Sequence, residues 1–382
     1  MKRKIINKRN SNIELLRIFA MLMIIAFHIW CHCINLQLTD LQMIRERANG
    51  WFCNPVFFKR LLALVVIAPM GQVGNAIFII ISGYFMAGKG NGIDLSKIAK
   101  KLLLQLGFST FVLSVLSIII YNIVTRNLIK LVDFDSFNNW SWFVGYYFVV
   151  IVLAKVFLNG FLDNLNKKNY TMFLLVIFAL IQFTWSRNIL TDLTNGLEVL
   201  FTGVFLYSLG GYVKKYNPFE KIRTEAIIVL IIGVNLIICG NYYIVTINNI
   251  LNFNYEDGAA FIQSIPEYFN YQFVPIVLGI SVFELFRRMK LSYNIVINYL
   301  GASTFMIYLF HDNEFFYKIW DMQDWITLLH ENVFRFIIVY IIYIVATFGI
   351  SAIVYMFFEL MRKGLKVCRK VIIRKEINVE EA

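Results

Sequence analysis

The sequence is poor in charged residues and in the residues that interrupt helices. Of its 382 residues, only 16% are Asp, Glu, Lys or Arg, whereas soluble domains carry about 25%. It has 5 prolines, and neither an internal repeat nor a Pro/Ser/Gly-rich linker divides it. These absences exclude a soluble enzyme, a disordered chain and a fibrous protein. They predict a single domain over residues 1–382, with short basic tails at both ends.

The 5 cysteines lack the spacing of a disulfide framework or of a structural metal site. There is no Cys-x-x-Cys pair, and no cysteine and histidine pair has the spacing of metal ligands. Cys31 and Cys33 flank His32, which is a weak metal signal on its own. We therefore expect no bound metal.

What the chain has instead is apolar sequence in long runs. Hydrophobic residues make up 59% of it, and its mean hydropathy is +0.66. A bilayer-spanning helix needs about 20 mainly apolar residues, and only structures with closed backbone hydrogen bonding are stable in lipid. We therefore predict an all-α, polytopic membrane protein with about ten transmembrane helices. The apolar blocks run approximately over 13–34, 61–87, 102–124, 142–160, 170–186, 196–213, 225–245, 272–288, 294–311 and 333–361.

The basic residues lie in short clusters between these blocks, so the net charge of +12 indicates membrane topology and not nucleic-acid binding. If the N-terminus is cytoplasmic, 25 of the 36 lysines and arginines lie in inner segments and 8 in outer ones. The first apolar run is long and lacks a small-residue cleavage site, so it is expected to be a membrane helix and not a signal peptide. The prediction is that both termini are cytoplasmic.

The first block carries ionisable residues within a membrane span, where they are costly and usually functional. Arg17 and His28 are 11 positions apart, which places them about 20° apart around a helix and about 16 Å apart along it. Glu14 lies on the same stripe, three residues before Arg17, and can pair with it. His28 could serve as the general base for a hydroxyl group. The alternative is a core histidine that is hydrogen-bonded to a neighbouring helix.

Three other blocks carry polar or aromatic residues. In the second block, Gly74 and Gly83 would permit close helix approach, and its polar side chains could line a cavity or simply pack: Gln72, Asn75, Ser82 and Tyr84. The fourth block opens at Trp140-Ser-Trp142-Phe143, which fits an interfacial aromatic belt as well as a sugar-stacking surface. The ninth block ends at Tyr308 and His311, and no role is assigned to His32 or His330.

In their order along the chain, these residues resemble the acyltransferase 3 family of membrane proteins, which O-acylate cell-surface polysaccharides. Glu14, Arg17 and His28 are similar to the family's opening pattern of an acidic residue, an arginine and, after ten residues, a histidine. Phe78 with Ser82-Gly83-Tyr84 resembles its Phe-x-x-x-Ser-Gly-Tyr motif. Three further segments are also similar to family features: Gly71-Gln-Val-Gly-Asn75, as in polysaccharide-cluster members from Gram-positive bacteria; Trp142-Phe143; and Gly301 to His311 with Thr304 and Tyr308.

The resemblance implies an enzyme of the bacterial plasma membrane that moves an acyl group, by default acetyl, from acyl-CoA as co-substrate, with no permanently bound cofactor. The implied acceptor is a sugar hydroxyl of a capsule or exopolysaccharide, or of its undecaprenyl-linked precursor, presented on the outer side. His28 would be catalytic, either as a base or through an acyl-histidine intermediate. The expected donor residues are Glu14, Arg17, Lys100 and Lys101; the expected cavity or oxyanion residues are Asn75, Ser82 and Tyr84; the expected acceptor-side residues are Trp142, Tyr308 and His311.

The chain departs from the family pattern at one place. Some members carry an Arg-x-x-Arg pair before the Phe-x-x-x-Ser-Gly-Tyr motif, and it is thought to contact the acyl donor. Residues 69–75 of this chain contain no arginine. Donor binding is therefore expected to depend on Arg17 and on three lysines at the inner face: Lys97, Lys100 and Lys101.

Two other classes of membrane protein remain as alternatives. A polysaccharide polymerase or flippase would also be polytopic and basic inside, but a polymerase is expected to have large outer loops with several arginines. A secondary transporter would carry ionisable groups at the midplane of several helices, often in inverted repeats. Here the strong polar signal is confined to the first two blocks, which favours acyl transfer.

Overall fold

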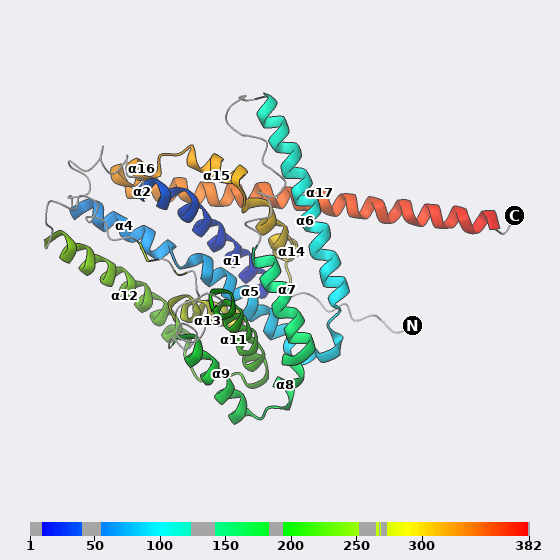
Figure 1. Ribbon diagram of the computed structural model, residues 1–382, viewed down its shortest axis with the longest axis horizontal. Helices are drawn as coiled ribbons and strands as arrows, with labels where there is room; N and C mark the ends of the chain where they lie inside the picture. Colours follow the sequence, from blue (N-terminus) through cyan, green and yellow to red (C-terminus); the bar gives the residue numbers. More distant parts are fainter. Residues whose placement is uncertain are drawn as a thin grey trace.

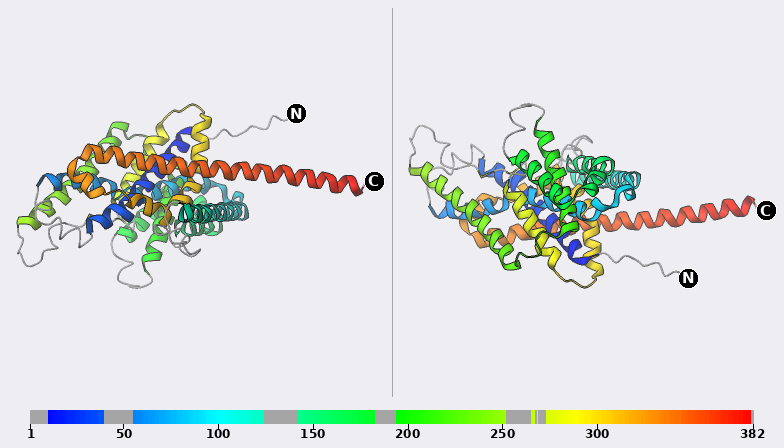
Figure 2. Two further views of the ribbon diagram at one scale, coloured as in Figure 1. Left: turned by 90° about the horizontal axis from the view of Figure 1, so that it is seen from above. Right: turned by 90° about the horizontal axis from the view of Figure 1, so that it is seen from below.

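The computed structural model describes residues 10–39, 55–123, 142–182, 194–251, 265–266, 268 and 273–380. All regular structure in these ranges is helical, and no strand occurs among them, which confirms the all-α prediction. The helices form one bundle, from which the C-terminal part of the last helix projects (Figures 1 and 2). Trp140 lies outside the described residues.

Helices occupy all ten apolar blocks. They are α1 (Ser11–Ile29) with the π-helical turn η1 (Trp30–Ile34) and α2 (Asn35–Thr39); α4 (Pro55–Ile67); α5 (Met70–Met86) with the 3₁₀ turn η2 (Ala87–Gly92); α6 (Leu95–Ile123); α7 (Trp142–Leu153) with the π-helical turn η3 (Ala154–Leu158) and α8 (Asn159–Asn164); α9 (Lys167–Gln182); α11 (Thr194–Tyr216); α12 (Thr224–Leu251); α13 (Phe273–Arg288); α14 (Ile295–His311); and α17 (Val333–Glu380).

Within the described ranges, six helical segments are long and apolar enough to cross a membrane. The prediction of about ten spans, and of two cytoplasmic termini, remains a prediction. The six segments are Ser11–Thr39, Lys59–Gly90, Leu95–Ile119, Trp142–Asn164, Thr224–Asn248 and Val333–Val367.

The second apolar block is two helices where the sequence suggested one. A turn at residues 68–69 separates α4 from α5, and Pro69 is the N-cap of α5. Proline has no N–H to donate to the preceding turn and disfavours helical geometry in the residue before it, so a break at this point follows from the sequence.

The centre of the bundle is α1, which packs against α5 on one side and α14 on the other. Glycines make the close approaches possible. A Cβ on Gly74 would meet the backbone oxygen of Ala20 and the side chain of Ile24, and one on Gly83 would meet the backbone of Tyr207 in α11. The small residues of the second block thus set the spacing of three helices.

Helix α14 runs beside α1 in the same direction. At one end, the Ser11 hydroxyl donates to Asn298 Oδ1 at 3.1 Å; further along, Gly301 lies against Glu14. At the other end, two short helices, α15 (Glu314–Asp321) and α16 (Trp325–Glu331), cap the bundle. Asn313 starts α15 by accepting from the backbone N–H of Phe315. We call these two ends the arginine end and the histidine end, after Arg17 and His28 of α1.

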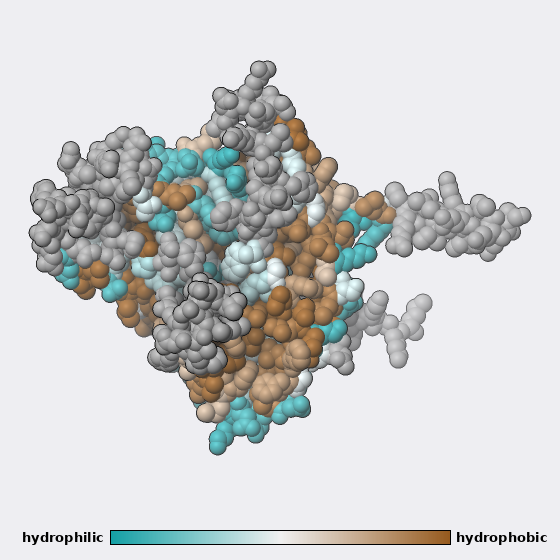
Figure 3. All heavy atoms as spheres, viewed as in Figure 1, coloured by the Kyte–Doolittle hydropathy of each residue, from teal (hydrophilic) through white to brown (hydrophobic). Residues whose placement is uncertain are grey.

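Large apolar side chains are exposed along α6, α12 and α17, such as Phe111, Ile237 and Ile338. In Figure 3, apolar residues cover much of the lower and right-hand part of the visible face, and hydrophilic ones lie at the tip where α8 and α9 meet and again toward the upper left. An apolar exterior of this extent suits contact with lipid.

Candidate functional site

Two histidines that are 283 residues apart in the sequence meet at the histidine end. His28 Nδ1 lies 3.0 Å from His311 Nε2, and the two rings stack with centroids 5.1 Å apart. His28 comes from the last turn of α1 and His311 from the last turn of α14. The parallel course of these helices therefore brings the two rings together.

The hydrogen bonds of His311 determine which nitrogen of each ring carries a proton. His311 Nδ1 lies 2.6 Å from the backbone oxygen of Ile307, and a carbonyl oxygen only accepts, so this nitrogen donates. In a neutral ring, His311 Nε2 then accepts, and the donor facing it is His28 Nδ1. Nε2 of a neutral His28 therefore carries the unshared pair that a base or a nucleophile needs.

The buried carboxylate of Asp312 lies close to Nδ1 of His28, the nitrogen that also faces His311. Asp312 Oδ1 is 3.3 Å from His28 Nδ1, and the hydroxyl groups of Tyr317 and Tyr308 both hydrogen-bond to Asp312. Burial raises the pKa of Asp312, while His311 and the hydrogen bond from Tyr317 oppose that rise. Burial and the nearby Asp312 raise the pKa of Tyr317, which keeps its phenol protonated and donating. The carboxylate is thus placed to stabilise a positive charge on His28.

A third histidine extends the cluster away from α14. The π-helical turn η1 follows α1 directly and places His32 with its ring 5.6 Å from that of His28. The His32 ring stacks on Tyr317 of α15 with centroids 4.0 Å apart. π-helical turns often mark functional sites. Among the described residues, no group of three His, Cys, Asp or Glu side chains is arranged to hold a metal ion.

A cavity of about 330 Å³, here called the central cavity, runs along α1 from the arginine end. Arg17, Met21 and Ile24 line it at positions one helical turn apart, which is the stripe that His28 continues. The opposite walls come from α5, α6, α7 and α14, through Phe78, Ser82, Lys101, Phe143, Tyr147, Gly301 and Tyr308 among others. Arg17 and Lys101 lie toward the arginine end of the cavity, and Phe143 and Tyr308 lie at the end nearest His28, here called the aromatic end.

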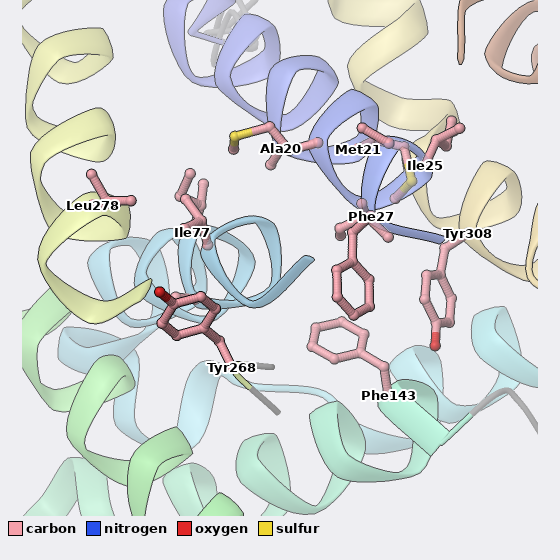
Figure 4. Close-up of a cluster of buried hydrophobic side chains, with 14 of the residues drawn as sticks. Ala20, Met21, Ile25, Phe27, Ile77, Phe143, Tyr268, Leu278 and Tyr308 are labelled. Carbon is pink, nitrogen blue, oxygen red and sulfur yellow. The ribbon is translucent and has the colours of Figure 1, made fainter. Parts of the chain in front are cut away.

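Tyr308 lies between the central cavity and the histidine pair. It lines the cavity, and its ring is 6.4 Å from the ring of His28. Phe143 of α7 points toward Phe27 (Figure 4), and its ring is 5.6 Å from that of Tyr308. The side chain of His28 keeps 11% of its surface exposed. A reactant at the aromatic end of the cavity would therefore lie beside Tyr308, whose ring is next to that of His28.

Arg17 lines the central cavity and has more hydrogen-bond donors than its ion pair with Glu14 uses. Its Nη1 lies 3.2 Å from Glu14 Oε1, and its side chain remains 30% exposed, against 7% for Glu14. Glu14 is itself packed against Gly301, where a Cβ would collide with its carboxylate. Because a guanidinium group has five N–H donors, the pair with Glu14 leaves others for a ligand.

The structure separates the remaining predicted residues. Ser82 and Lys101 line the central cavity, and the Ser82 hydroxyl donates to the backbone oxygen of Phe78 at 2.9 Å and lies 3.3 Å from the Tyr147 hydroxyl. Four others are not among the described residues that line the central cavity: Lys100, Asn75, Trp142 and Tyr84. Lys100 is exposed and Asn75 is buried. Trp142 is exposed beside Tyr146, and Tyr84 packs on Phe283 under the ammonium of Lys214.

Three site residues were missed by the sequence reasoning: Asp312, Tyr317 and His32. Asp312 directly follows His311 in the sequence, and an acidic residue next to a histidine at a helix end could have indicated a site residue. Tyr317 had no signal of its own. His32 has no role in the sequence analysis because the sequence gives no indication of the π-helical turn that keeps its ring near His28.

Comparison with known proteins identifies a family for the chain. Residues 10–356 match the acyltransferase domain that defines the acyltransferase 3 family. No curated protein and no solved structure matches the chain.

Proposed function

Because the chain belongs to the acyltransferase 3 family, and is therefore an acyltransferase with a multi-pass membrane architecture, we propose that it transfers an acetyl group from acetyl-CoA to a sugar hydroxyl. The acceptor would be a cell-surface polysaccharide or its lipid-linked precursor. The observation that carries the proposal is the hydrogen-bonded His28–His311 pair with Asp312, set beyond the aromatic end of a cavity that has Arg17 at its other end.

The donor would occupy the central cavity. Arg17 and Lys101 lie at its arginine end and would pair with the phosphates of coenzyme A. The pantetheine arm would follow the apolar stripe of Met21 and Ile24 toward Tyr308, which brings the thioester within reach of His28. Glu14 would hold the Arg17 side chain in place.

The chemical step would use the unprotonated Nε2 of His28. The acceptor hydroxyl oxygen attacks the thioester carbonyl carbon while Nε2 takes the hydroxyl proton. The tetrahedral intermediate then collapses, the carbon–sulfur bond breaks, and the imidazolium returns the proton to the leaving thiolate. Asp312 stabilises the imidazolium, and His311 holds the ring in its reactive tautomer. The same nitrogen would be the nucleophile in a two-step route through acyl-histidine.

In this proposal the arginine end faces the cytoplasm, where acetyl-CoA is made, and the histidine end faces outward. The protein would then lie in the bacterial plasma membrane with its N-terminus inside. The excess of lysine and arginine in the inner segments supports this orientation.

The test is a count by NMR of O-acetyl esters on the purified surface polysaccharide from a deletion strain carrying wild-type protein, His28→Ala or His330→Ala. His330 is a matched control because it packs on Phe57 of α4, away from the histidine pair. We expect wild type and His330→Ala to restore the ester signal and His28→Ala to leave it absent, at equal protein levels. If wild type restores no esters to the deletion strain but changes polymer amount or chain length, the protein would be a polymerase or flippase.

A further inference from the structure

A second cavity, of about 290 Å³, lies at the histidine end and is called here the side pocket. It is built between η1 and α2 on one side and α15 on the other. Its polar and aromatic lining is His32, Gln37, Glu314, Tyr317, Lys318 and Asp321. Among the described linings, no residue belongs to both the side pocket and the central cavity.

Two lining residues of the side pocket, His32 and Tyr317, link it to the histidine pair. His32 lines the pocket, and its ring is 5.6 Å from that of His28. Tyr317 lines it too, and its hydroxyl donates to the carboxylate of Asp312, which lies 3.3 Å from His28. A molecule in this pocket would therefore approach His28 from the side opposite to the arginine end of the central cavity.

The frame of the pocket is held by hydrogen bonds that cross between its two walls. Gln37 of α2 donates to Asp321 Oδ1 and to the backbone oxygen of Gln323, each at 3.0 Å. Its own side-chain oxygen accepts from the backbone N–H of Trp325 at 2.9 Å. These bonds tie α2 to the segment between α15 and α16, so the pocket is preformed, as ligand sites usually are.

The chemistry of the lining suits a sugar ring. His32 and Tyr317 stack on each other, so each ring has one face that the other does not cover and that could pack on the apolar CH face of a pyranose. Glu314 and Asp321 accept hydrogen bonds, and Lys318 donates them, which matches hydroxyl groups that do both. The volume is near the lower end of the range for small-molecule sites, about 300–1,000 Å³, and fits one ring better than a long chain segment.

We propose that the side pocket is the acceptor subsite and binds one sugar residue of the glycan, with a hydroxyl directed at His28. This inference rests on the proposed function. The two substrates then reach His28 through separate openings, the acyl-CoA from the arginine end and the sugar from the histidine end. The hydroxyl gives its proton to His28 and its oxygen to the acyl carbon, and coenzyme A leaves with its sulfur reprotonated through the central cavity.

The test is to block the side pocket in intact cells with a thiol reagent that cannot cross the membrane. Glu314→Cys is treated with a membrane-impermeant, negatively charged methanethiosulfonate, and O-acetyl esters added to the polysaccharide after treatment are counted by NMR. Glu331→Cys is the matched control, because Glu331 is an exposed glutamate at the end of α16, outside the pocket lining. Treated wild type controls for the native cysteines. Leu36→Cys is a second variant in case the first is inactive before treatment, because Leu36 lines the pocket, is exposed, and has no assigned role in binding.

We expect the reagent to lower new esters at least fivefold in Glu314→Cys or Leu36→Cys, and to leave Glu331→Cys and wild type unchanged. The inference is overturned if both pocket variants are labelled and keep their ester count, if the Glu331→Cys control loses esters equally, or if the reagent reaches none of the three cysteines. These failures are distinct from failure of the proposed function, in which wild type would restore no esters to the deletion strain, or His28→Ala would restore as many as wild type.

Discussion

Replacing Asp312 with asparagine should slow acyl transfer without weakening donor binding. Asp312 Oδ1 lies 3.3 Å from Nδ1 of His28, the ring that we propose becomes positively charged during the reaction. The carboxylate would stabilise a charge that the resting enzyme lacks, so its effect belongs to the transition state. Asparagine keeps the size and an acceptor oxygen but removes the negative charge.

The geometry bounds the size of this effect. Two unit charges 3.3 Å apart attract by about 5 kcal/mol at an effective dielectric constant of about 20. That figure is an upper bound, because the hydroxyl groups of Tyr308 and Tyr317 share the charge of the carboxylate. A hydrogen bond to a charged group contributes about 1.5–3 kcal/mol net, and each 1.36 kcal/mol is about tenfold in rate. We therefore expect kcat to fall about 10- to 150-fold.

The assay is release of the coenzyme A thiol from acetyl-CoA, in membranes of the deletion strain that supply the acceptor. The KM for acetyl-CoA should stay unchanged because Asp312 is not among the described residues that line the central cavity. Asp312→Glu should recover part of kcat, and Asp163→Asn, at an exposed position in α8, should match wild type. An unchanged kcat, or a raised KM with normal kcat, would refute the role assigned to Asp312.

Two further variants test the donor end and the helix packing. Arg17→Ala should lower kcat/KM for acetyl-CoA about 10- to 150-fold by removing a charged hydrogen bond to phosphate, while Arg223→Ala, at an arginine whose side chain is 82% exposed, should have no effect. Equal losses in both would argue against a donor site at Arg17. Gly83→Ala should lower thermal stability in detergent by about 1–3 kcal/mol, because its methyl group would meet the backbone of Tyr207. Gly145→Ala, with open space around the added methyl, should be neutral or stabilising, and a stable Gly83→Ala would contradict the packing.

Much of the fold follows from the sequence because it depends on local physics. A long apolar run in lipid has to close its backbone hydrogen bonds within itself, and helices form in the described part of each of the ten blocks. The helical period alone places Arg17 and His28 on one stripe, and the lining of the central cavity by Met21 and Ile24 follows that stripe. The same period separates Ser82 from Tyr84, which lie about 200° apart around α5, so only one of them could face the cavity.

The site itself was decided by tertiary structure. The contact between His28 and His311 joins residues 283 positions apart, and it forms because α1 and α14 run in the same direction with Glu14 seated on Gly301. No pattern within either helix specifies that direction. The role of Asp312 follows from the same contact, because its carboxylate can stabilise a charge on His28 only when α14 lies beside α1.

The side pocket shows the same division between sequence and structure. The sequence shows charged and aromatic residues side by side in α15 (Glu314–Asp321), but it does not determine that the chain returns to lay Tyr317 on His32. It also gave no sign of the π-helical turn that keeps His32 near His28. Local hydrophobic period and backbone hydrogen bonding therefore determined the helices and the Arg17–His28 stripe. Packing between distant helices decided which polar groups meet, because that choice depends on contacts that no single segment contains.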